Sequence, residues 1–517
     1  MTFSDTVRFL FSLGPELKTV KWDLDRIRAL LAEIGNPQDR CRYIHVAGTN
    51  GKGSTCAMLA SSLRVAGYRT GLYTSPHLVD PRERIQIDGE QISEAAWVEG
   101  FEQVHAASET LLAREEIDAH PSFFETVTAM AFCAFARAGA EVVVLEVGLG
   151  GRLDATNVIV PEVAVITPVD FDHEAFLGSS IESIAAEKAG ILKAGRPAVF
   201  ASQRQEALGV LEHKALELAV PVTHSSAWRI EDLVSDRFGS RFTLVADEEI
   251  PVVCPLAGAH QVENARTAAA ALAVFGVSAP AIREGIARAV WPGRLERIGF
   301  DPAFILDGAH NPAGARALAA YIKEFFADEP VRIVYGAMRD KAVEEVTNTL
   351  FPLAQEVIVT APDQPRALNP ESLAEITEHP NLKIAATLPE AIDLARANPM
   401  TTFITGSLFL VGEARALLLA PHANFRAEVD QYAVADPMPA IQNLSAITGV
   451  PVDRLIRYVL VKYAASAPDA LLSLDPIVFR QMREHVARAE AEGSAEARLR
   501  AYEALKGMIS WLGLPAA

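Results

Sequence analysis

Hydrophobic residues in the first 290 positions follow two patterns, and each pattern predicts a different kind of element. Continuous apolar runs with the length of buried parallel strands lie at 43–47, 141–148 and 163–168. Apolar residues at helical spacing lie at 54–66, 121–138 and 256–272. Because strand and helix patterns alternate, we expect a doubly wound α/β domain at 1–292, with a helical lead-in over its first 39 residues.

The alternation is interrupted at 291–296, WPGRLE, where proline and glycine mark a domain boundary. Strand-like runs that end in polar residues then recur between helical segments at 304–312, 332–341, 356–362 and 403–415. This pattern predicts a second, smaller, Rossmann-like α/β domain at 293–420. Segment 421–517 has helical patterns and no strand pattern, so we expect an all-α appendage there.

Composition and charge narrow the classes of partner. The chain has 517 residues, half of them apolar, which is too many for one hydrophobic core and indicates two or three domains. It carries 47 Lys and Arg against 66 Asp and Glu, a formal charge of −19. That balance argues against binding to nucleic acid or to an anionic membrane. The appendage is close to neutral and lacks the basic face of a DNA reader, so self-association or a protein partner is expected of 421–517.

Cysteine usage and the N-terminus indicate the compartment. The four cysteines, Cys41, Cys56, Cys133 and Cys254, are far apart and have no metal-ligand spacing. Neither a disulfide framework, nor a zinc site, nor a redox cofactor is therefore expected. The N-terminus lacks a signal-peptide pattern, and no uninterrupted apolar stretch approaches the ~18 residues of a membrane span. We expect a cytoplasmic protein.

The segment 43–54, YIHVAGTNGKGS, places a glycine-rich turn between a strand and a helix. Glycines let the backbone turn tightly and direct N–H groups at an anion, while Lys52 adds a mobile ammonium. The segment departs from the standard phosphate loop, because Val46 replaces its first glycine and Gly53 separates Lys52 from the hydroxyl residue. A flexible turn is the alternative, but the flanking patterns favour a nucleotide triphosphate. The predicted ATP-binding loop comprises Gly48, Thr49, Asn50, Gly51, Lys52, Gly53 and Ser54.

Other side chains stand out by their position. Glu146 lies near the carboxyl end of a predicted strand, where open α/β sheets collect functional groups, and with Ser75 it offers oxygen ligands for Mg²⁺. Glu125 stands among phenylalanines and is either an acid in the first turn of a helix or a group with a binding role. Lys188 follows Glu187, and such a pair is ordinarily a solvated helix face.

Three segments resemble one family. GTNGKGS at 48–54, SFFE at 122–125 and the block at 166–193, ITPVDFDHEAFLGSSIESIAAEKAGILK, are similar to folylpolyglutamate and dihydrofolate synthases, which are Mur-type ATP-dependent ligases. The resemblance covers about residues 1–420. It implies addition of L-glutamate to dihydropteroate and to the γ-carboxylate of reduced folates through an acyl phosphate, with ATP and one or two Mg²⁺ ions.

The resemblance also implies residue roles. The implied catalytic residues are Lys52, His173, Lys188, Asp307 and His310. Asn264, Arg294 and Asp307 join the ATP-binding loop. The implied substrate-binding residues are Ser122, Phe123, Phe124, Glu125, Leu153, Asp154 and Ala155. The implied metal ligands are Ser75, Glu146, His173 and, if it is carbamylated, Lys188.

Other functions remain open. A monofunctional folylpolyglutamate synthase would lack the activity on dihydropteroate. A Mur-type cell-wall ligase would carry a UDP-sugar-binding domain before the loop, and only 47 residues precede Gly48 here, about half of the ~100 that a small domain needs. A non-catalytic nucleotide-binding scaffold is disfavoured because the candidate groups outside the loop are all present.

Overall fold

The computed structural model describes residues 1–13, 23–298, 303–339 and 342–419. The chain divides into two compact units, Met1–Leu418 and Leu419–Ala517. The predicted all-α appendage at 421–517, with the self-association or protein partner expected of it, lies outside the described residues. Among the described helices, none combines the length and the apolar character that a membrane crossing requires.

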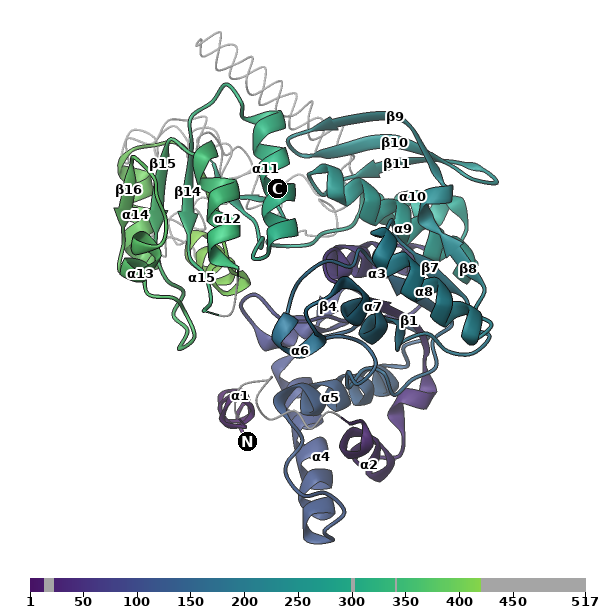
Figure 1. Ribbon diagram of the computed structural model, residues 1–517. Helices are drawn as coiled ribbons and strands as arrows, with labels where there is room; N and C mark the ends of the chain where they lie inside the picture. Colours follow the sequence, from purple (N-terminus) through teal and green to yellow (C-terminus); the bar gives the residue numbers. More distant parts are fainter. Residues whose placement is uncertain (14–22, 299–302, 340–341, 420–517) are drawn as a thin grey trace, which may run out of the picture. The chain divides into compact units, whose positions relative to one another are not determined.

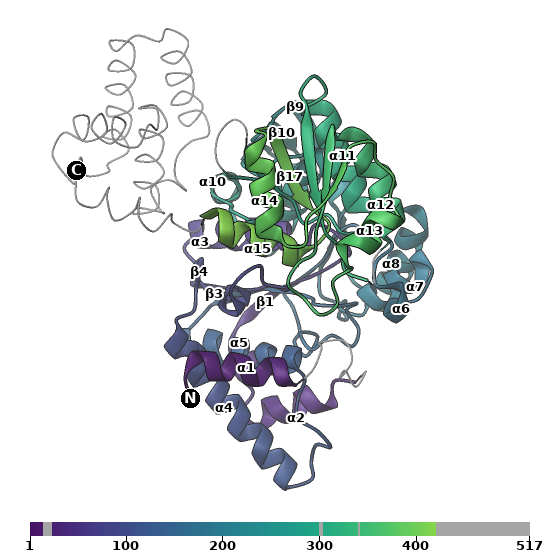
Figure 2. The ribbon, with the colours of Figure 1, turned by 90° about the vertical axis from the view of Figure 1, so that its left-hand side faces the viewer.

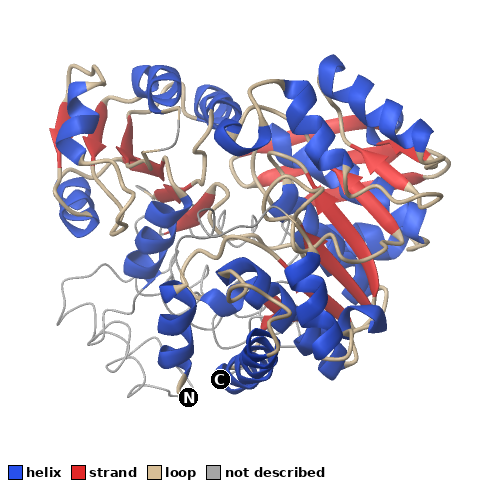
Figure 3. Ribbon diagram, turned by 60° about the horizontal axis from the view of Figure 1, so that its bottom comes forward, coloured by secondary structure: helices blue, strands red, loops and turns tan. Residues whose placement is uncertain are grey.

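An eight-stranded sheet organises the first part of the chain (Figures 1 and 3). Its strands, in spatial order, are β4 (Glu90–Gln91), β3 (Ile85–Ile87), β2 (Thr70–Tyr73), β5 (Val142–Glu146), β1 (Arg42–Ala47), β6 (Val163–Ile166), β7 (Ala198–Phe200) and β8 (Val222–His224). The strands from β2 to β8 pair in parallel, and β3 and β4 add an antiparallel edge. The predicted doubly wound α/β fold is confirmed.

Both faces of this sheet are covered, which explains why its strands read as continuous apolar runs. On β1, Ile44 and Val46 belong to one buried cluster, whereas Tyr43 belongs to the cluster on the opposite face. The first face packs against α3 (Lys52–Val65), α9 (Ala259–Phe275) and α10 (Ala279–Ala287). The second face packs against α4 (Glu94–Ala113), α5 (Phe123–Ala138), α7 (Ile181–Ala189) and α8 (Gln205–Glu217).

The described residues of the predicted helical lead-in, 1–13 and 23–40, contain two helices and a short turn. These are α1 (Phe3–Ser12), α2 (Asp25–Glu33) and the 3₁₀ turn Pro37–Arg40. Helix α1 lies against α4, and α2 contacts both α4 and α5 (Figure 2). The lead-in therefore extends the helical layer on the second face of the sheet.

A three-stranded antiparallel sheet interrupts the expected alternation between 195 and 292. Its strands are β9 (Arg229–Asp236), β10 (Gly239–Val245) and β11 (Glu249–Cys254). Phe242, Leu244, Ile250 and Val252 point into the core beside α9, whereas most of β9 is exposed. One face is buried and one is open to solvent, as is usual for antiparallel sheets.

A six-stranded sheet follows α10, so the boundary expected near 292 falls between that helix and the first strand of the new sheet. In spatial order its strands are β12 (Glu296–Ile298), β13 (Phe304–Leu306), β17 (Thr401–Thr405), β14 (Val331–Tyr335), β15 (Glu356–Val359) and β16 (Leu382–Ile384). All neighbours are parallel except β12 and β13. Each of the four strand-like runs predicted here overlaps one of these strands, namely β13, β14, β15 and β17. Strands β12 and β16 were not predicted.

Helices cover both faces of the second sheet as well. The cluster on one face includes residues of α11 (Pro312–Phe325), α12 (Val343–Leu350) and α13 (Pro370–Glu375). The cluster on the other face includes residues of α14 (Leu388–Ala397) and α15 (Leu408–Leu419). Because the strands are parallel, their carboxyl ends share one edge, and the loop after β13 that carries Asp307 and His310 lies there.

Candidate functional site

The glycine-rich loop runs from the end of β1 directly into α3, and at two positions only glycine fits. Gly48 has φ +152° and Gly51 has φ +86°. A Cβ atom would overlap Oγ1 of Thr167 at Gly48 and Oδ1 of Asn264 at Gly51. Both positions therefore combine a backbone conformation that favours glycine with a close approach of a neighbouring side chain.

The loop presents its donors at the start of the helix. Helix α3 begins after Gly51 without a side-chain cap, so no side chain competes for its first-turn N–H groups. The amides of Thr49 and Asn50 donate instead to the Pro168 carbonyl, at 3.0 and 3.4 Å. The anion site stays a prediction, and the backbone N–H groups left available for it lie at the N-terminus of α3, where the helix dipole favours an anion.

Both predicted lysines reach the loop. The Lys52 ammonium donates to the carbonyls of Gly48 and Thr49, each at 3.1 Å. Lys188 is buried and donates to the Gly48 carbonyl at 2.8 Å. Burial, aided by the charge of Lys52, lowers the pKa of Lys188 to about 7. The reading of Lys188 as half of a solvated pair is wrong, because Glu187 pairs with Arg152 at 2.9 Å instead.

The two oxygen ligands expected for magnesium also meet. Glu146 ends β5, is buried, and accepts a hydrogen bond from the Ser75 N–H at 3.0 Å. Burial raises the pKa of Glu146, and the Lys52 charge opposes that shift. The sequence supplies a carboxylate at Glu146 and a hydroxyl at Ser75, both oxygen donors of the hard type that Mg²⁺ prefers, and the contact between the two residues is made by the Ser75 backbone.

His173 contacts the preceding residue, Asp172. It has φ +54° at the start of α6 (Glu174–Leu177), its N–H donates to Oδ1 of Asp172 at 2.9 Å, and its Nε2 lies 3.9 Å from the same oxygen. Among the described residues, one cluster of three His, Cys, Asp or Glu side chains is compact enough for a metal, and it contains neither His173 nor Glu146. A shared second metal at Glu146, His173 and Lys188 stays a prediction.

Asn264 lies against the loop, in a chain of polar side chains. Its Nδ2 donates to Oε1 of Gln261 at 3.0 Å, and Gln261 in turn donates to the Ser54 hydroxyl at 3.2 Å. All three side chains are buried. Asn264 and Ser54 were predicted as site residues, and Gln261 was not. Gln261 occupies the first turn of α9, which begins at Ala259, three residues after the start of the predicted helical segment at 256.

Arg294 and Asp307 face each other after the domain boundary. Asp307 follows β13 and accepts hydrogen bonds from the N–H groups of Leu295 and Ala309, both at 3.0 Å. Burial raises the pKa of Asp307, and Arg294 and these hydrogen bonds oppose the shift. Burial lowers the pKa of Arg294, whereas Asp307 and Glu146 raise it. Arg294 therefore lies in the field of one carboxylate from each sheet.

The loop after β6 contacts the start of α11. Nε2 of His310 lies 3.3 Å from Oδ2 of Asp172. Asn311 donates to the same oxygen and to Oδ1 of Asn50, both at 3.1 Å, while its own oxygen caps α11. Arg316 pairs with Asp170 at 3.1 Å. The sequence reading assigned no role to Asn311, although an asparagine directly before a proline at a helix start is the signature of an N-cap.

The predicted substrate-binding residues divide into two local structures. Ser122 and Glu125 form a reciprocal capping box at the start of α5, so the first-turn reading of Glu125 is observed. The same carboxylate also pairs with Arg26 of α2 at 2.8 Å, with both side chains buried. Asp154 is buried and accepts hydrogen bonds from Thr156 and from the N–H of Leu149.

The hydrophobic members of the set share one environment. Phe123 and Ala155 are buried in the same cluster, with Phe124 packed against it. The Phe124 ring covers Gly148, where a Cβ atom would come within 2.5 Å of Cζ. Leu153 lies in the turn between Gly151 and Asp154. Phe124 therefore links α5 to the end of β5, next to Glu146.

Comparisons with known proteins place the chain among ligases. The model of the Mur ligase middle domain matches residues 46–272, and the model of the Mur ligase, glutamate ligase domain matches 293–408. Residues 418–517 match a family of unknown function, DUF6027. The Dihydrofolate synthase/folylpolyglutamate synthase of Bacillus subtilis is 36% identical over 412 residues, which are 77% of this chain and 95% of that protein.

Two further similarities extend this result. A Probable bifunctional folylpolyglutamate synthase/dihydropteroate synthase of Haloferax volcanii is 37% identical over 432 residues; they cover 80% of this chain and 50% of the relative, so the chain spans about half its length. The Mycobacterium tuberculosis folylpolyglutamate synthase solved with ADP and AMPPCP superposes with a TM-score of 0.75 at 36% identity, covering 80% of this chain and 99% of that one.

Proposed function

This chain belongs to the folylpolyglutamate and dihydrofolate synthase family of the Mur ligases, and from that premise we propose that it is an ATP-dependent ligase that adds L-glutamate to folates. We propose both activities, on dihydropteroate and on the γ-carboxylate of reduced folates. The Bacillus subtilis relative, which this chain matches over 95% of that protein's length, carries both names. A monofunctional folylpolyglutamate synthase is the second candidate.

The observation that carries the proposal is the geometry of the glycine-rich loop at 48–54. Gly48 and Gly51 admit no side chain, α3 begins without a side-chain cap, and Lys52 reaches back over the loop. These features fit the phosphates of ATP. Lys52 neutralises phosphate charge, and Arg294, between Glu146 and Asp307, is a second cation for the same purpose.

The oxygen donor set at Ser75 and Glu146 fits Mg²⁺, which lowers the charge repulsion between the phosphates and an attacking carboxylate when it is bound. Glu146 is buried within the field of Lys52, so an additional cation near it offsets the cost that burial imposes on its negative charge. We assign Ser75 and Glu146 to this ion, with His173 as a ligand of a second one.

Lys188 is proposed to carry a carbamate. A pKa of about 7 leaves a large share of the amine unprotonated at neutral pH, and the free amine is the form that attacks CO₂. The nitrogen lone pair forms the N–C bond, one proton leaves to solvent, and the product is an anion. That anion would replace a cation beside Lys52 and could hold a metal or orient a neighbour.

The substrate is assigned to the segments 122–125 and 153–155. Phe123 and Phe124 supply aromatic surface for a pterin ring, while the paired Glu125 and the buried Asp154 supply hydrogen-bond acceptors. His310 and Asp307 are assigned to ATP or to the incoming glutamate, with 1–292 and 293–420 as the two domains of the ligase. From the wide spacing of the four cysteines in the sequence, we propose a reducing compartment, the cytoplasm.

One assay tests the function. Purified enzyme is given ATP, Mg²⁺ and L-glutamate with either dihydropteroate or tetrahydrofolate, and ADP and the glutamylated product are both measured. We expect product from each substrate. Product from tetrahydrofolate alone would support the monofunctional candidate, and a chain that binds ATP but forms neither product would be a nucleotide-binding scaffold.

A further inference from the structure

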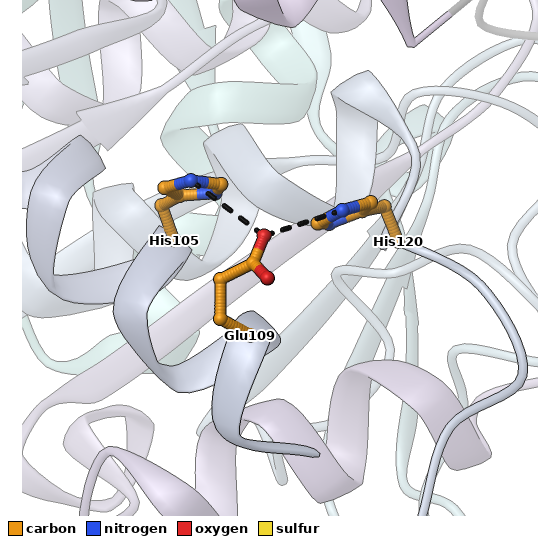
Figure 4. Close-up of side chains that lie close together, drawn as sticks. All are labelled: His105, Glu109 and His120. Carbon is orange, nitrogen blue, oxygen red and sulfur yellow. Dashed lines mark ion pairs between the residues drawn. The ribbon is translucent and has the colours of Figure 1, made fainter. Parts of the chain in front are cut away.

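A cluster of two histidines and a glutamate lies outside the proposed active site, at the end of α4. His105 and Glu109 are one helical turn apart, and His120 comes from the segment between α4 and α5 (Figure 4). One nitrogen of each imidazole and one carboxylate oxygen lie within 4.8 Å of one another. Both Nε2 atoms face the same oxygen, Oε1 of Glu109.

The two His–Glu separations are those of ion pairs, and they fit ligands of a shared metal ion better than direct hydrogen bonds. Nε2 of His105 is 3.7 Å and Nε2 of His120 is 3.4 Å from Oε1 of Glu109. Hydrogen bonds from nitrogen to oxygen close at roughly 2.7–3.2 Å, so both separations are too long for that purpose. Ligands that share a tetrahedral zinc ion at about 2.0–2.1 Å stand about 3.4 Å apart.

Aromatic neighbours hold the two imidazoles in place. Phe9 of α1 meets His105 edge to face at a centroid distance of 4.8 Å, and His120 at 6.1 Å. Phe101, one turn earlier on α4, stacks on His105 at 5.4 Å. The two imidazoles lie nearly parallel, with an interplanar angle of 20°. A preformed ligand set of this kind loses little side-chain freedom when an ion binds.

We propose that His105, Glu109 and His120 bind a divalent transition metal ion of the zinc class. Two imidazole nitrogens select against Mg²⁺ and Ca²⁺, which require oxygen ligands, and favour Zn²⁺. The three side chains are partly exposed, at 30%, 55% and 35%, so an ion reaches them from solvent and water completes the fourth position. The site contains no cysteine, which is why cysteine spacing in the sequence gave no sign of it.

The position of the site indicates its consequence. His120 lies two residues before Ser122, the cap of α5, and Phe9 brings α1 to the same point. An ion at this place fastens α4 to the segment that leads into α5. Bound metal therefore raises the thermal stability of the chain, without taking part in ligation.

The test uses the full chain, stripped of metal by a chelator and kept in excess Mg²⁺ so that oxygen sites are filled. Zn²⁺ affinity is measured by calorimetry for the parent, His105→Ala, His120→Ala, Glu109→Gln and the control His213→Ala. His213 is an exposed histidine on α8. We expect one Zn²⁺ equivalent in the parent and the control, and at least a tenfold loss of affinity in His105→Ala and His120→Ala.

Two further measurements complete the design. Co²⁺ should give the intense visible absorption of a tetrahedral complex in the parent and lose it in His120→Ala. Zn²⁺ should raise the melting temperature of the parent and of the control His213→Ala, but not that of His105→Ala or His120→Ala. Circular dichroism checks the fold of each variant. If a histidine variant unfolds, the Zn²⁺ affinity of Glu109→Gln replaces it in the test, because this substitution preserves the size of the side chain. Parental Zn²⁺ affinity in the folded variants would overturn the proposal.

Discussion

The buried ammonium of Lys188 donates a hydrogen bond to the carbonyl of Gly48, 2.8 Å away. This bond joins α7 to the first residue of the glycine-rich loop across 140 positions of the sequence. Lys52 donates to the same carbonyl from the other side of the loop. Two lysine side chains thus converge on one backbone oxygen, so a change at either lysine acts on the shape of the loop as well as on its charge.

Replacement of Lys52 by alanine should abolish ligation and leave the fold intact. The side chain is partly exposed and its ammonium donates to two loop carbonyls, so we expect its main role to be the stabilisation of phosphoryl charge. We expect kcat to fall on the order of 10²-fold or more. Steady-state ADP release measures the effect, and Lys214→Ala, which removes a lysine on α8 paired with Glu217, is the matched control. Near-normal turnover of folded Lys52→Ala would refute the nucleotide assignment.

Activity should depend on carbon dioxide through Lys188. After CO₂ is stripped at mildly acidic pH, activity should drop, and added bicarbonate should restore it as the carbamate re-forms. Lys188→Ala should be inactive and should not respond to bicarbonate. An enzyme whose rate is the same with and without bicarbonate, together with an unextended side chain in a metal-loaded crystal, would contradict the carbamate.

Arg26→Met should destabilise the protein by about 3 kcal/mol, because it leaves the buried Glu125 carboxylate without its cation. The double variant Arg26→Met with Glu125→Gln should recover part of that loss. Arg114→Met, which removes an exposed pair with Glu33, should cost less than about 1 kcal/mol. Urea unfolding measures all three. Since Glu125 is also assigned to the substrate, KM for dihydropteroate should rise in both variants that alter the pair.

Asn311→Ala should weaken catalysis more than it weakens the fold. Loss of the cap on α11 costs about 1 kcal/mol, and loss of the amide also removes the hydrogen bonds to Asn50 in the loop and to Asp172. We expect kcat/KM to fall at least tenfold. Asn369→Ala, which removes the cap of α13, is a control of similar structural cost. Equal activity of the two variants would remove Asn311 from the site.

Stability should fall as the pH drops below about 6.5. Burial lowers the pKa of His45 and of His77 to about 3, and that of His260 to about 4. Between these values and about 6.5 the unfolded chain binds protons that the native chain does not, so the free energy of unfolding decreases with falling pH. Thermal melts from pH 7 to pH 4 measure the slope. His45→Leu should flatten it, and an unchanged slope would exclude His45 as a source.

The sequence predicted local structure better than contacts between distant segments. Unbroken apolar runs identify buried strands such as β5 and β6 in the sequence. The glycine-rich turn with its lysine identifies the loop. Partners such as Arg26 and Glu125, 99 positions apart, leave no pattern at either position. The three strands β9–β11 were read as part of an α/β alternation, because the sequence did not show that they pair with one another in an antiparallel sheet. Gln261 and Asn311 bond to residues 207 and 261 positions away.

Asp170 and Asp172 stand two residues apart after β6, and both bond to the opening residues of α11. This arrangement sets a requirement for recombination between related ligases. A chimera that takes residues 293–420 from one parent and the preceding part from another must inherit compatible partners at 170 and 172. Crossover at 292 alone would pair the two aspartates of one parent with Asn311 and Arg316 of the other, and we expect such chimeras to fold but to be inactive. Exchanging the short segment 168–173 as well should restore their activity.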